Sequence, residues 1–72
     1  MLRILDFSEL AVGDKVVLIS VKGTGIPEFF LYHETEVTKL TDGCQVYTHL
    51  TRDCPLYAIH LLKAETFFAL NS

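Results

Sequence analysis

The sequence predicts a single, mainly all-β domain that folds as a small five-stranded barrel over residues 1–72. The chain has 72 residues, enough for one hydrophobic core. It contains five short runs rich in β-branched and aromatic residues, and Gly, Pro and Asp separate them. Because closing a sheet removes its exposed edges, five short strands favour a barrel.

The first strand is expected over residues 16–21, directly after the turn formers Gly13 and Asp14. This run is apolar on both faces, so both faces should be covered. Residues 2–10, which precede the turn, have apolar spacing that suits one helical turn or a short strand equally, and both options stay open.

The second strand is expected over residues 28–40, after a loop at residues 22–27 that contains two glycines and one proline. The loop lacks the Lys-Ser/Thr pair and the helix of a phosphate-binding loop, so it is a turn. Val37 and Leu40 are three residues apart and cannot share one face of a regular strand. If both are buried, a bulge is expected near Thr38 and Lys39.

The third strand is expected over residues 44–50, because Asp42 and Gly43 form a typical hairpin turn. Alternation gives each face of this strand its own set of side chains. The core-facing set is Cys44, Val46, Thr48 and Leu50, and the opposite set is Gln45, Tyr47 and His49.

Two closing strands are expected over residues 56–62 and 66–70, after a polar break at residues 51–55. A short helical turn fits between these strands at residues 63–65. One continuous helix over residues 56–70 is the competing interpretation, because Ala, Leu, Lys and Glu dominate its middle.

Residues 8–17 contain a Leu-x-Val-Gly-Asp-x-Val phrase, and residues 37–41 read Val-Thr-Lys-Leu-Thr. The first phrase resembles the opening of SH3-like and KOW-type barrels, and both phrases resemble segments of small phage and plasmid proteins. The resemblance implies a five-stranded SH3-like barrel and a small accessory or inhibitor protein of a phage or mobile element. The length and strand count are also similar to those of ring-forming Sm-type barrels.

The composition points to a protein partner. Half of the residues are apolar, more than so small a fold is expected to bury, so self-association or docking to another protein is expected. The formal charge of −3 disfavours phosphate binding. The alternative function is a KOW- or Sm-like nucleic-acid-binding module, which would use Lys15, Lys22, Lys39 and Arg52.

The candidate partner-binding residues form an expected aromatic strip. Alternation along residues 29–32 would place about half of these large side chains on the outer face of a strand. The alternative is that the N-terminal segment folds over the strip. The strip consists of Phe29, Phe30, Tyr32, Tyr47, His49 and Tyr57.

The sequence predicts no catalytic residues, no metal and no cofactor. Its C-x4-H-x4-C-x5-H series does not have the close ligand pairs of structural zinc sites. A Cys-His nucleophile would also need an orienting group and a pocket. Without an export signal or a long apolar run, a cytoplasmic protein with reduced Cys44 and Cys54 and no membrane span is expected. The four residues of the series are Cys44, His49, Cys54 and His60.

Overall fold

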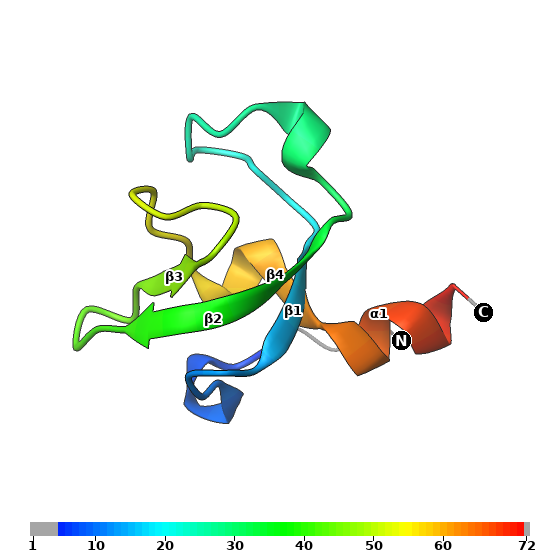
Figure 1. Ribbon diagram of the computed structural model, residues 1–72, viewed down its shortest axis with the longest axis horizontal. Helices are drawn as coiled ribbons and strands as arrows, with labels where there is room; N and C mark the ends of the chain where they lie inside the picture. The colour runs from blue at the N-terminus through cyan, green and yellow to red at the C-terminus, as the bar shows by residue number, and fades with distance from the viewer. Residues whose placement is uncertain (1–4, 72) are drawn as a thin grey trace.

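A four-stranded antiparallel sheet in the order β3-β2-β1-β4 organises the chain in the computed structural model, which describes residues 5–71 (Figure 1). Among the described residues, one α-helix follows the last strand, one 3-10 turn precedes β1, and two more lie between strands. The elements are η1 (Phe7–Glu9), β1 (Lys15–Leu18), η2 (Glu28–Phe30), β2 (Glu34–Leu40), β3 (Val46–Thr48), η3 (Ala58–His60), β4 (Leu61–Lys63) and α1 (Ala64–Leu70).

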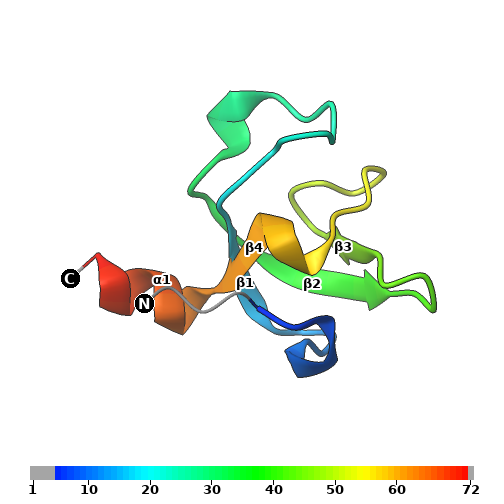
Figure 2. The same cartoon turned by 180° about the vertical axis from the view of Figure 1, so that it is seen from behind.

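The sheet is open, so the prediction of a closed five-stranded barrel is wrong. Leu56 pairs with Val46 of β3 through a single bridge, with N–O distances of 2.7 and 2.9 Å, and forms no strand. The chain then turns through η3 and pairs with β1 as β4. Figure 2 shows η3 in front of the sheet on this path from one sheet edge to the other.

Strand β1 confirms that the first predicted strand is covered on both faces. Val16 and Leu18 point into the main core, while Val17 points to the opposite face, and all three are fully buried. The strand is shorter than the expected residues 16–21. Its ladder continues by one bond, from the Ile19 N–H to the His60 carbonyl at 2.8 Å, before the chain enters the loop to η2.

Strand β2 begins at Glu34, so the expected strand over residues 28–40 is wrong in its first part. Pro27 has φ −60° and leads into η2, where the Phe30 N–H bonds to the Pro27 carbonyl at 3.1 Å. Tyr32 then has a φ of 66°, which is incompatible with a strand. The predicted bulge is confirmed, because the β2–β3 register shifts between Val37 and Lys39.

The predicted hairpin between β2 and β3 is confirmed, with the Cys44 N–H bonded to the Thr41 carbonyl at 3.1 Å. The third strand is only three residues long, and Val46 and Thr48 are buried as expected. Cys44 was expected in the core but is exposed. Its φ of 63° shows why, since the residue belongs to the turn and not to the alternating strand.

The C-terminal segment combines parts of both interpretations of residues 56–70. Residues 66–70 are helical and not a strand, but the helix begins only at Ala64. Strand β4 precedes it directly. At the other end of the chain, η1 provides the N-terminal helical turn, with Asp6 accepting from the Ser8 N–H at 3.2 Å in a capping box. Residues 2–4 of the expected segment lie outside the described residues.

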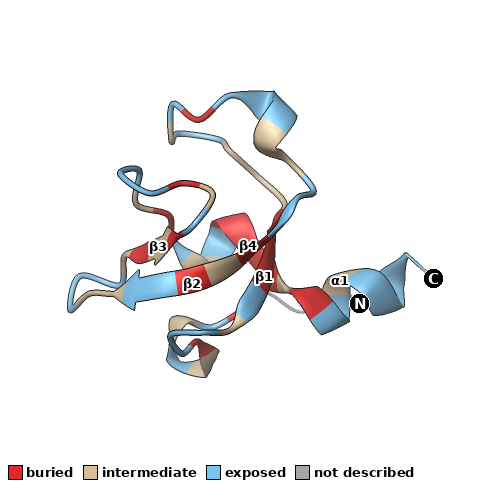
Figure 3. Ribbon diagram, viewed as in Figure 1, coloured by how far each residue is buried: buried red, intermediate tan, exposed pale blue. Residues whose placement is uncertain are grey.

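Buried residues of all four strands contribute to the main core (Figure 3). Phe30 and Leu31, which lie in the long loop between β1 and β2, pack against it. The core residues are Leu5, Leu10, Val16, Leu18, Ile26, Val37, Val46, Leu56 and Leu61.

His60 connects this core to the long loop between β1 and β2. Its Nδ1 accepts from the Tyr57 N–H at 3.0 Å, and its Nε2 lies 3.1 Å from the Lys22 carbonyl oxygen. Because Nδ1 acts as an acceptor, the ring proton resides on Nε2, which donates to Lys22. The buried ring thus ties η3 to the loop.

Candidate protein-binding surface

The six residues of the expected aromatic strip lie on several different elements. Phe29 and Phe30 belong to η2, Tyr47 to β3, and Tyr57 precedes η3. Phe29 is 74% exposed, while Phe30 is half-buried against the core. The expected strip depended on strand alternation over residues 28–40. Residues 28–30 form the η2 turn instead, so their side chains do not alternate between two faces of a sheet.

Tyr47, His49 and Tyr57 lie at separate places. The Lys39 ammonium lies over the Tyr47 ring, 5.4 Å from its centroid, in a cross-strand contact. The Tyr57 ring lies 6.2 Å from the ring of the buried His60. His49 is exposed and follows β3, with its N–H bonded to the Glu36 carbonyl at 3.1 Å.

Tyr32 forms an aromatic cluster with α1 that the sequence did not reveal. Its ring stacks on Phe67 with the ring centroids 6.1 Å apart and the planes inclined by 23°. Phe67 in turn meets Phe68 edge-on at 5.5 Å. We call Tyr32, Phe67 and Phe68 the α1 aromatic cluster. The sequence placed both phenylalanines on a strand, although Ala64, Phe67 and Phe68 also have helical spacing.

Tyr32 occupies a strained backbone position. Its φ of 66° lies in the left-handed region, which costs a residue with a Cβ roughly 1–2 kcal/mol. The position is held by a 2.7 Å bond from the Tyr32 N–H to the Leu18 carbonyl. Yet the residue is 64% exposed, so core packing does not explain a large ring here. A strained and exposed aromatic residue is typical of a functional position.

Helix α1 uses only part of its surface to pack on the sheet (Figure 3). It contacts β1 and β4, where Val17 and Leu62 form a second buried apolar patch and Ala64 is buried. The rest of the helix is largely open to solvent, with Phe68 51% and Leu70 57% exposed. Leu70 lies three residues after Phe67 on the helix and enlarges the apolar surface of the α1 aromatic cluster.

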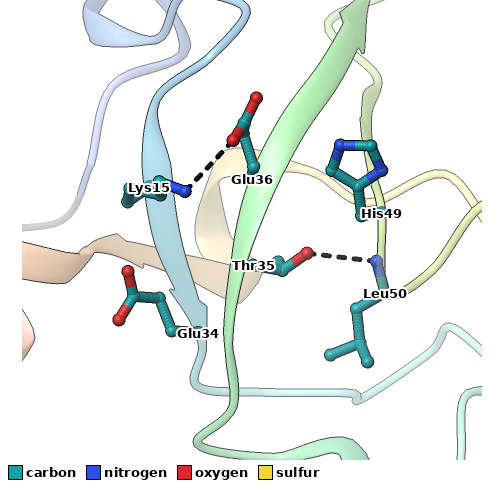
Figure 4. Close-up of a pocket in the computed structure, with 6 residues that line it drawn as sticks. All are labelled: Lys15, Glu34, Thr35, Glu36, His49 and Leu50. Carbon is teal, nitrogen blue, oxygen red and sulfur yellow. Dashed lines mark hydrogen bonds and ion pairs between the residues drawn. The ribbon is translucent and has the colours of Figure 1, made fainter.

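A groove lies on the β1–β2 face that carries Lys15 (Figure 4). The Lys15 ammonium binds the Glu36 carboxylate at 3.1 Å across the two strands. On the other side, the Leu50 N–H donates to the Thr35 hydroxyl at 3.0 Å and holds the loop after β3 against β2. The groove is lined by Lys15, Glu34, Thr35, Glu36, His49 and Leu50.

A second depression continues this groove toward α1. The two share Lys15 and Glu34, so they form one surface that we call the sheet groove. The Lys63 ammonium lies 3.5 Å from the Asp14 carboxylate in this part. Phe68 lines its far end, so the groove meets the α1 aromatic cluster there. The second part is lined by Asp14, Lys15, Glu34, Lys63, Ala64, Glu65 and Phe68.

The residues of the possible zinc series are not assembled. Cys44 and Cys54 are free, exposed thiols, whereas His60 is buried with both ring nitrogens engaged. Over residues 5–71, no group of three or more His, Cys, Asp or Glu side chains is arranged to hold a metal ion.

No helix within residues 5–71 has both the length and the apolar character needed to cross a membrane. Comparison of the chain with protein-family models, with curated proteins and with solved structures finds no match in any of the three.

Proposed function

We propose that this chain is a non-enzymatic protein-binding module that contacts its partner through the α1 aromatic cluster and the adjoining apolar surface of α1. The observation that carries the proposal is the Tyr32 ring, which is held out to solvent on a strained backbone. Tyr and Phe side chains are enriched in protein interfaces because they offer a large apolar area with few rotatable bonds.

The exposed rings provide enough surface for a moderate interaction. At about 200 Å² for each aromatic side chain, the exposed fractions of Tyr32 (64%) and Phe68 (51%) amount to roughly 230 Å². Burying that area is worth about 6 kcal/mol. Association itself costs at least about 4 kcal/mol, so these rings need support from Leu70 and the neighbouring surface.

We expect the partner to be a second copy of this chain. A surface patch that includes its own two-fold axis can contact the same patch on another copy, as in most symmetric dimers. Stacked and edge-on aromatic rings suit such a contact. A small phage-type accessory or inhibitor protein, the kind that the resemblance of the Leu-x-Val-Gly-Asp-x-Val phrase implies, would be consistent with this role.

The nucleic-acid alternative has less support. Lys15 is paired with Glu36, and Lys39 lies over Tyr47, so two of its four candidate cations are already engaged. The net charge of −3 adds repulsion from phosphates. Binding of single-stranded RNA or DNA that falls steeply as salt rises would favour this alternative over the protein-binding module.

Sedimentation equilibrium over a range of chain concentrations tests the proposal. We expect the wild-type chain to self-associate and Tyr32→Ser or Phe68→Ser to raise the dissociation constant at least tenfold. Ile59→Ser is the matched control, because Ile59 is also apolar and 66% exposed but lies in η3. A chain that is monomeric at all concentrations, or cluster variants that match the control, would contradict the proposal.

A further inference from the structure

We propose that the sheet groove binds an extended segment of a protein partner that carries lysine or arginine beside an apolar side chain. This inference deepens the protein-binding function and rests on it. It names the chemistry of the segment that the groove accepts.

The groove carries more negative than positive charge. Its two lysines are both engaged, Lys15 with Glu36 at 3.1 Å and Lys63 with Asp14 at 3.5 Å. Glu34 and Glu65 also line the groove, and neither has an ion pair or a side-chain hydrogen bond to any residue within 5–71. Two carboxylates are therefore left without a cation in a groove that a partner can enter.

Glu34 occupies the central position, because it lines both parts of the groove. Figure 4 shows its carboxylate apart from the Lys15–Glu36 ion pair. In the β1–β2 register, Glu34 lies opposite Val17, which is fully buried, while Lys15, the cation of β1 in the groove, lies opposite Glu36 and pairs with it. A lysine or arginine of a partner would supply the missing charge.

Each part of the groove also has one large apolar lining residue. Phe68 lines the end toward α1, and Leu50 lines the end toward the loop after β3. Exposed ion pairs contribute little affinity on their own, so the apolar contacts must supply most of it. The charges instead select among segments, because an acidic segment would meet repulsion from Glu34 and Glu65. The occupant is therefore a mixed basic and apolar segment.

Fluorescence anisotropy with the full chain and two labelled peptides tests this inference. One peptide alternates lysine with leucine, and the other alternates glutamate with leucine. We expect the basic peptide to bind at least tenfold more tightly than the acidic one at low salt. The double variant Glu34→Gln/Glu65→Gln should weaken binding of the basic peptide about tenfold.

The matched control is Glu28→Gln/Asp42→Asn, which removes the same total charge at exposed positions outside the groove. We expect this control to bind the basic peptide within a factor of two of wild type. Equal binding of both peptides would overturn the inference, and so would equal weakening in the groove and control variants.

Sedimentation of the same variants separates this inference from the proposed function. We expect Glu34→Gln/Glu65→Gln to leave self-association unchanged. If the groove variant alters self-association and not peptide binding, the occupant is a second copy and the inference is wrong. If Tyr32→Ser fails to alter self-association while peptide binding still depends on Glu34, then the aromatic interface fails and the groove assignment stands.

Discussion

Replacing Tyr32 with glycine should leave the fold nearly as stable as wild type while removing the aromatic ring. Glycine adopts a φ of 66° without the penalty of roughly 1–2 kcal/mol that a Cβ brings. The ring is 64% exposed, so it buries about 70 Å² of a side chain of about 200 Å². At 25 cal/mol per Å², its packing on Phe67 is worth about 2 kcal/mol.

These two terms nearly cancel, so Tyr32→Gly should lower the free energy of unfolding by at most about 1 kcal/mol. Tyr32→Ala loses the same packing but keeps the strained backbone, and it should be about 1 kcal/mol less stable than the glycine variant. Urea denaturation followed by circular dichroism measures both values. Equal stabilities for the two variants would refute the claim of strain, and a loss above about 3 kcal/mol for glycine would make the ring structural.

Two further variants test the packing around this surface. His60→Ala removes two hydrogen bonds and a buried ring, and should lower the free energy of unfolding, measured by urea denaturation, by about 2–4 kcal/mol. The control is His33→Ala at an exposed position, which should lower it by less than about 1 kcal/mol. Phe30→Ser should destabilise the fold by about 2 kcal/mol or more, because Phe30 packs on the core, while Phe29→Ser should shift the melting temperature by only a few degrees. Similar losses for Phe30→Ser and Phe29→Ser would contradict the burial difference.

Some features of the fold depend on short-range chemistry and were predictable from sequence. Asp14 bonds back to the Ala11 N–H at 2.9 Å, and Gly13 takes a φ of 97°, which makes the turn into β1 a local property. The hairpin at residues 41–45 is local in the same way. The bulge in β2 follows from the spacing of Val37 and Leu40.

The candidate site depends on tertiary contacts between distant segments, which local sequence patterns do not predict. Tyr32 was expected on the outer face of a strand and is exposed in a left-handed turn position instead, and its partner Phe67 was placed on a strand. Aromatic residues favour strands by intrinsic preference, and a tertiary contact overrode that preference. The groove was missed entirely, because it joins β1, β2, α1 and the loop after β3.

The sequence by itself determined a small sheet-rich domain, the turns at residues 11–14 and 41–45, and a β1 strand covered on both faces, because backbone turns and strand alternation depend on near neighbours. Only the tertiary structure decided that the sheet stays open, that residues 64–70 are helical and that Tyr32 meets Phe67. The apolar patch of Val17 and Leu62 on the second face of the sheet requires a cover, and α1 packs on that face. This packing joins segments that are far apart in the chain, so the local sequence pattern of residues 64–70 does not predict it.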